Sequence, residues 1–162
     1  MIDGWLFWID HTTIGTTIRQ SAWLFPLIET FHLFGIVSLV ASTSILDLRL
    51  LGTGPMRHWP VSKLTGRLLP WAWWGFAVQL VSGLLMTSSE SVKNYHNHAF
   101  RLKMLLILLA ALNFWLFHAT SYKHVADWDN DRLSPLPARL MGIFSILLWF
   151  GIVAAGRYIA YY

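Results

Sequence analysis

The chain alternates between four long apolar stretches and shorter polar connections. The apolar stretches lie at about 24–46, 68–87, 99–121 and 137–160. Each has about the 20 residues that an α-helix needs to cross a hydrocarbon core of ~30 Å. Because lipid offers no hydrogen bonds to the backbone, such stretches are stable only as helices or closed barrels. We therefore expect an all-α integral membrane protein, a four-helix up-down bundle that forms a single membrane domain over residues 1–162.

Residues 2–21 mix apolar and polar side chains too closely to span a bilayer. Aromatic and aliphatic positions alternate with Asp3, Asp10, His11 and Arg19, a pattern typical of an amphipathic helix that lies in the membrane interface. The segment has neither the basic start nor the small-residue cleavage site of a signal peptide. We expect an N-terminal interfacial amphipathic helix that belongs to the mature chain.

Composition supports the membrane class. Hydrophobic residues make up 56% of the chain, charged residues only 12%, and the mean hydropathy is +0.51. The net charge of +4 does not indicate nucleic-acid binding, because the basic residues are spread over short connections and form no stripe. The absence of cysteine excludes disulfides, thiolate ligands and iron–sulfur ligation.

The basic residues also predict the topology. More basic residues lie in the first and third connections than on the opposite side of the membrane. Those of the first and third connections are Arg49, Arg57, Lys63, Arg67, Lys123, Arg132 and Arg139. Loops rich in Lys and Arg stay in the cytoplasm. We therefore expect both termini on the non-cytoplasmic side of the membrane.

Ionisable residues inside the apolar stretches are the strongest functional signal. Glu29 and His32 lie one helical turn apart in the first stretch, where each charge costs ~2.5–3.5 kcal/mol to insert. At ~1.5 Å per residue, Glu29 is roughly 8 Å and His32 roughly 12 Å from the outer end of the helix. By the same rise, Lys103 is roughly 6 Å and Arg157 roughly 7 Å deep. Three predicted helices thus place ionisable groups in one outer layer.

Haem b requires this combination of groups. A neutral imidazole ligates its iron, and Lys or Arg pairs with its propionates. The hypothesis makes His32 the axial ligand and assigns the propionates, or an anionic substrate, to Lys103, Arg157 and Arg101. Glu29 would orient His32 or relay protons, so Glu29 and Lys103 are the candidate catalytic residues.

A structural interpretation competes with this hypothesis. Glu29 would form a buried ion pair with Lys103 or Arg157, and His32 would hydrogen-bond to a neighbouring helix. His118 lies roughly 29 Å from the outer end and cannot share a small ligand with His32. It is either an interfacial histidine or a contact for a second haem or a quinone.

Two further functions remain open. The chain is alternatively a non-enzymatic accessory or anchor subunit of a larger membrane complex, or a homo-oligomer, in which the polar layer is structural. The other alternative is copper handling through His32, His96, His98 and Met86. The sequence lacks the repeated Met and His residues expected for soft-metal transport.

Several segments carry a resemblance to known proteins: IRQSAWLFPLIETFH, LDLRLLG, LLPWAWWGFAVQLVSGLLM, NHAFRLKMLLILLAALN and GRYIAY. They resemble an uncharacterised family of small bacterial inner-membrane proteins. The layout is more distantly similar to HemJ-type protoporphyrinogen oxidases and CopD-type copper-resistance membrane domains. The HemJ resemblance implies haem b, an essential histidine at His32 and an essential lysine at Lys103. It also implies oxidation of a porphyrin-like or quinol substrate, with the quinone pool as a redox partner.

Overall fold

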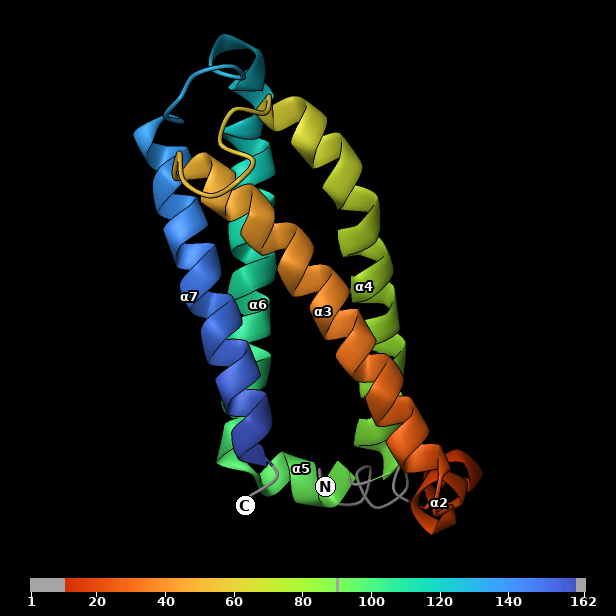
Figure 1. The fold of residues 1–162 in the computed structure, drawn as a ribbon. Helices are drawn as coiled ribbons and strands as arrows, with labels where there is room; N and C mark the ends of the chain where they lie inside the picture. The colour runs from red at the N-terminus through yellow and green to blue at the C-terminus, as the bar shows by residue number, and fades with distance from the viewer. Residues whose placement is uncertain (1–10, 90, 160–162) are drawn as a thin grey trace.

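The computed structural model describes residues 11–89 and 91–159, and in these residues all regular structure is helical. Four long helices dominate, with two short helices and a 3₁₀ helix at their ends (Figure 1). The long helices are α3 (Leu24–Leu50), α4 (Val61–Ser89), α6 (His98–Ala119) and α7 (Leu136–Tyr158). The short elements are α2 (Thr13–Gln20), α5 (Ser91–His96) and the 3₁₀ helix η1 (Tyr122–Asp127). The all-α prediction is confirmed.

All four long helices are long and apolar enough to cross a membrane, as a multi-pass membrane protein requires. Their side chains are mostly exposed within the single chain. In the most apolar 18-residue segment of α6, for example, only 6% of the residues are buried. Large apolar side chains such as Phe150, which is 77% exposed, point outward. In water such a surface would be unstable, so lipid or partner helices must cover it.

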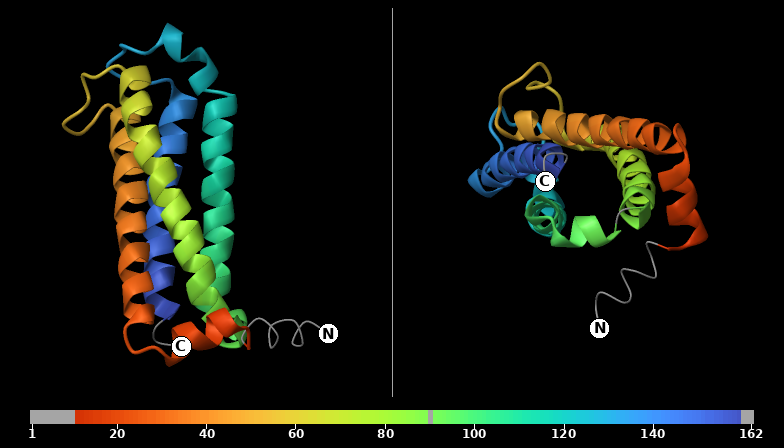
Figure 2. Two further views of the ribbon diagram at one scale, coloured as in Figure 1. Left: turned by 90° about the vertical axis from the view of Figure 1, so that its right-hand side faces the viewer. Right: turned by 90° about the horizontal axis from the view of Figure 1, so that it is seen from below.

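The helices form two antiparallel pairs, α3 with α4 and α6 with α7. Helix α3 also packs against α7, whereas the backbones of α4 and α6 stay apart in the described chain, and these two helices meet through the rings of Trp73 and Phe114 (6.1 Å between centroids). The order around the bundle is therefore α4, α3, α7, α6 (Figure 2). Helices α3 and α7 are close at one end and diverge toward the other (Figure 1). We call the first the loop end, because residues 51–60 and 120–135 connect helices there, and the other the α5 end.

The α5 end is held by polar contacts from its short helices. The Arg19 guanidinium of α2 donates to the Ser89 carbonyl at the end of α4 (3.0 Å). Asn97 caps α6 by accepting from the Ala99 amide (2.8 Å). The described part of the predicted amphipathic segment is thus helical in α2, and residues 1–10 lie outside the described residues.

The loop end contains the apolar core. Leu50, Val61, Phe117, Trp128 and Ala138 are each at most 6% exposed and form one cluster. They come from the ends of all four long helices and from the connection after η1. The loop end is therefore the well-packed end of the bundle.

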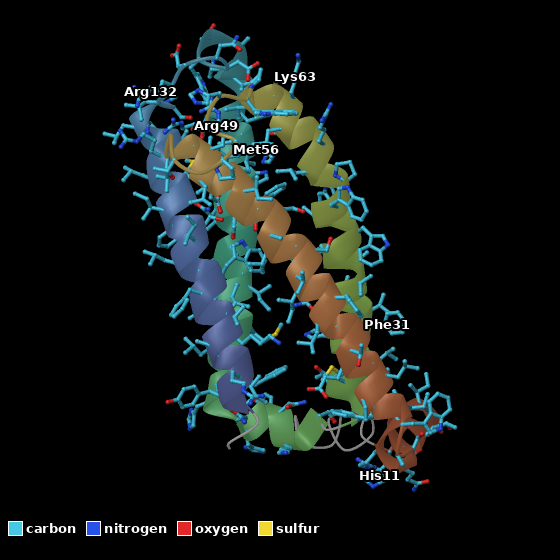
Figure 3. All side chains as sticks on the ribbon, in the orientation of Figure 1. His11, Phe31, Arg49, Met56, Lys63 and Arg132 are labelled. Carbon is cyan, nitrogen blue, oxygen red and sulfur yellow. The ribbon has the colours of Figure 1, made fainter. Side chains whose placement is uncertain are left out.

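Arg49 joins the two connections at this end, where it lies close to the ribbon of α3 (Figure 3). Its side chain is 2% exposed and donates to three backbone carbonyls: Trp59 (2.6 Å), Asp129 (3.2 Å) and Asp131 (3.0 Å). The Asp129 carboxylate in turn accepts from the amide (2.7 Å) and the hydroxyl (2.6 Å) of Ser62 at the start of α4. Asp129 therefore satisfies a backbone donor that the helix start leaves open.

Small residues allow α3 and α4 to touch through their backbones. A Cβ atom at Gly75 would lie 2.7 Å from the Leu39 amide and 2.8 Å from the Gly35 carbonyl oxygen. A Cβ atom at Gly35 would lie 3.1 Å from the Gly75 carbonyl oxygen. Close approach at small residues is the usual way that membrane helices gain packing energy.

Gly75→Ala should destabilise the protein by about 1–3 kcal/mol, because its methyl group would push two helix backbones apart. Gly66→Ala in the same helix is the matched control, since a Cβ atom at Gly66 has no neighbour within 4 Å. Gly66→Ala should be neutral or stabilising because alanine favours helix more than glycine. Thermal unfolding of both variants in the same detergent measures these effects. Equal unfolding midpoints for Gly75→Ala and Gly66→Ala would contradict the close contact between α3 and α4 at Gly75.

Arg49→Met should weaken the loop end by at least about 1.5–3 kcal/mol, the typical value of a hydrogen bond to a charged group. The substitution keeps the apolar stem but leaves three loop carbonyls without their donor. Limited proteolysis in the two connections should become faster, while Arg132→Met on the exposed surface should leave the rate unchanged. If the two connections of Arg49→Met were cleaved no faster than those of the wild type, this stabilising role of Arg49 would be contradicted.

Candidate functional site

His32 lies on α3 near the α5 end and is directed toward α4. It is half-buried, and its Nδ1 atom lies 2.8 Å from the Ser82 hydroxyl oxygen. Ser82 is only 5% exposed. The imidazole is therefore held between the two helices of one pair.

The hydrogen-bond network assigns the tautomer of His32. The Ser82 hydroxyl lies 2.5 Å from the Val78 carbonyl oxygen, which can only accept. A hydroxyl has a single hydrogen, so Ser82 must accept from His32, and Nδ1 carries the proton. The Nε2 atom of the neutral ring then carries the lone pair. A histidine whose Nδ1 proton is bound in this way is prepared to ligate a metal through Nε2.

Gly83 makes room for the ring. A Cβ atom at Gly83 would lie 3.4 Å from His32 Cε1 and 3.9 Å from Nδ1. The imidazole thus lies against the backbone of α4 beside Ser82. A Cβ atom at position 83 would be in ordinary van der Waals contact with the ring.

Lys103 approaches from the other helix pair. It is half-buried on α6, and its Nζ atom lies 3.8 Å from the place where a Cβ atom of Gly156 on α7 would be. Lys103 is close enough to His32 for a Coulomb interaction between the two side chains. Within the described chain its ammonium group has no hydrogen-bond acceptor and no carboxylate within 4.0 Å. The structure thus brings together an imidazole from α3 and an unneutralised cation from α6.

Glu29 does not join this pair directly. It is exposed, and no ion pair or hydrogen bond to Lys103, Arg157 or any other described residue involves it. It lies five turns from Asp47 and so on the same face of α3, the face that meets Gly142 of α7 at the loop end. Because α3 and α7 diverge toward the α5 end (Figure 1), Glu29 stays exposed.

Two sequence-based roles can be compared with this geometry. The structural ion pair between Glu29 and Lys103 or Arg157 is absent from the described residues. The hydrogen bond that orients His32 comes from Ser82 and not from Glu29. The role of Glu29 as a proton relay stays a prediction.

The other basic and histidine candidates of the α5 end are on the surface. Arg101 and Arg157 are exposed at the start of α6 and the end of α7, and His96 and His98 are exposed beside α5. The described residues contain no group of three or more His, Asp or Glu side chains placed to hold a metal ion. This geometry gives the copper hypothesis no support.

His118 belongs to the loop end. Its Nδ1 donates to the Phe114 carbonyl (3.0 Å), and its Nε2 is buried with no partner among the described residues. The ring stacks on Phe114 (4.2 Å between centroids) and contacts Tyr122 (5.1 Å). His118 thus lies in an aromatic cluster at the opposite end from His32.

The sequence did not predict Ser82, Gly83 and Gly156 as residues of the site. Each is a small residue in an apolar helix, where such residues usually serve helix packing. Their only signal is that they lie in spans near the depth of His32 and Lys103. The pairing of the spans, which decides that Ser82 meets His32, comes from the tertiary structure alone.

Ser82→Ala should allow His32 to adopt both neutral tautomers. With no hydroxyl to accept from Nδ1, the Nε2–H form should gain population. Nitrogen NMR of protein labelled with ¹⁵N-histidine measures the two ring nitrogens, and His32→Gln assigns the signals. Ser88→Ala is the control, because the Ser88 hydroxyl bonds only the Leu85 carbonyl. An unchanged His32 spectrum in Ser82→Ala would refute the assignment.

Comparison with known proteins adds a family. The model of a family of unknown function, DUF6644, matches residues 7–162. No curated protein and no solved structure matches the chain. The predicted resemblance to an uncharacterised family is confirmed, and no comparison links the chain to HemJ-type or CopD-type proteins.

Proposed function

The chain belongs to the DUF6644 family of unknown function, and we propose that it binds haem b through His32 and serves in electron transfer within the membrane. One observation carries the proposal: the His32 imidazole donates from Nδ1 to Ser82, which leaves Nε2 as its metal-ligating atom, and it lies within Coulomb range of a lysine that has no acidic partner among the described residues. The imidazole comes from one helix pair and the lysine from the other.

The residues present fit a haem by the chemistry of their donors. Axial ligation needs one imidazole nitrogen with a lone pair, which the bond from Nδ1 to Ser82 leaves at Nε2. The propionates need cations, and Lys103 lacks a counter-charge in the described chain. When bound, haem would supply a one-electron redox centre.

The chain's own residues then have defined tasks. Ser82 and Gly83 hold the His32 ring against α4. Lys103 would pair with a propionate or an anionic substrate, and Arg101 and Arg157 would extend the positive charge toward the α5 end. Glu29, exposed on α3 toward the same end, would relay protons to or from the site.

The redox partners follow from the expected placement in the membrane. We propose that the protein lies in the bacterial inner membrane with both termini in the periplasm. Electrons would pass between a periplasmic donor, or a porphyrin-like substrate as in HemJ-type oxidases, and the quinone pool.

A second candidate function is supported by α6. Of its residues only Phe117 is buried, and α6 packs mainly against α7. Such a helix offers a long apolar surface to a partner, as expected for an accessory or anchor subunit of a larger complex. Co-purification of partners in stoichiometric amounts, unaffected by His32→Ala, is the result that this function predicts.

Haem binding is tested by the visible spectrum of the detergent-solubilised protein. The wild type should show a Soret band that shifts on reduction with dithionite, and His32→Ala should abolish it. Lys103→Met should keep the band but release haem at least tenfold faster, because a propionate loses its counter-charge. Folding of each variant is checked by gel filtration and circular dichroism.

His96→Ala is the matched control, since His96 is exposed and lies at the same end of the bundle. Its spectrum should equal that of the wild type. A colourless wild-type preparation that takes up no added haemin, at full protein yield, would refute the haem proposal and favour the subunit function.

A further inference from the structure

We infer that the loop end of the protein carries a binding site for the headgroup of an anionic phospholipid. The site consists of Trp59, Lys63 and Arg67, together with Arg57, which precedes Trp59 by two residues in the chain; we call these four residues the cationic corner. They belong to the connection after α3 and to the first two turns of α4. Lys63 lies at the loop end of α4, far from Phe31, the chain neighbour of His32 (Figure 3).

Arg67 is held in place by an aromatic ring. Its guanidinium carbon lies 5.0 Å from the centre of the Trp59 ring, a cation–π contact. This contact uses none of the guanidinium N–H groups as hydrogen-bond donors to oxygen, so these groups stay available for other partners. Those groups match two oxygens of one phosphate.

The other two cations lie close by in the chain. Lys63 precedes Arg67 by four residues, so both lie on the same side of α4. Arg57 uses its Nε hydrogen to donate to His58 (2.9 Å), and its terminal nitrogens form no other hydrogen bond in the described chain. Lys63, Arg67 and Arg57 are all exposed.

The protein does not neutralise this corner. No described carboxylate lies within 4.0 Å of Lys63, Arg67 or Arg57. Asp129 contacts the start of α4, but both of its oxygens accept from Ser62. The cationic corner is therefore open to an external anion.

The position along α4 indicates lipid as the source of that anion. Arg67 directly precedes the apolar stretch of α4, and it lies ~6 Å before Trp71 along the helix axis. Trp71, which is 63% exposed, is the kind of residue that marks the membrane interface. The headgroup layer is roughly 5–7 Å thick on each side of the hydrocarbon. Arg67 thus lies at the depth of lipid phosphates, and Lys63 lies one turn further out.

The charge of the corner selects the headgroup class. A phosphodiester bound by Arg67 would place the rest of the headgroup next to Lys63. A choline or ethanolamine cation would meet like charge there, whereas the uncharged glycerol of phosphatidylglycerol would not. The ligand is therefore an anionic phospholipid. This inference does not depend on haem binding, because no residue of the cationic corner contacts the His32 site.

Thermal unfolding of the purified full chain in a neutral detergent tests the site. Added phosphatidylglycerol should raise the unfolding midpoint of the wild type, whereas phosphatidylcholine or inorganic phosphate at equal concentration should not. Lys63→Gln/Arg67→Gln should lose most of the shift and at least tenfold in affinity for phosphatidylglycerol, measured as bound lipid by native mass spectrometry.

Lys123→Gln/Arg132→Gln is the matched control, because it removes two exposed cations from the same end of the molecule without touching Trp59. It should respond to phosphatidylglycerol like the wild type. Equal losses in both double variants would show general charge attraction and overturn the site. An equal response to phosphatidylcholine, or to inorganic phosphate, would overturn the anionic lipid as its ligand.

Discussion

The hydrogen bonds of Arg49 are the constraint on which the bundle depends. A buried guanidinium binds carbonyls in both connections of the loop end, so the α3–α4 pair and the α6–α7 pair are tied together there. The apolar cluster around Leu50 and Trp128 packs next to it. Toward the other end α3 and α7 diverge (Figure 1). The described bundle is thus closely packed at one end and open at the other.

This asymmetry explains where the candidate site lies. Within each pair the helices pack at small residues, as at Gly35 and Gly75, and the same pattern places His32 against Gly83 and Lys103 near Gly156. Where the pairs separate, the two polar side chains stay within Coulomb range of each other but are not neutralised by the described protein. Polar groups in an apolar surrounding are costly without partners, so a ligand that bridges the pairs would stabilise the open end.

The two ends also differ in their relation to the bilayer. At the loop end, exposed cations and Trp59 surround the start of α4 and suit the headgroup layer. At the α5 end, α2 and α5 cover the ends of the long helices. The proposed haem site and the proposed lipid site are therefore separated by the length of the bundle, and a substitution at one end should leave the other unaffected.

The sequence by itself determined that four apolar stretches become helices, because their length and hydropathy leave lipid-exposed backbone no other solution. It also singled out His32 and Lys103, since ionisable residues in such stretches are rare enough to be noticed. Only the tertiary structure decided that Ser82 orients His32, that Glu29 has no ion pair or hydrogen bond among the described side chains and that Arg49 is buried. Those facts depend on which helices are neighbours and how they cross. Single-sequence periodicity has no information on either, because the spans are apolar on every side.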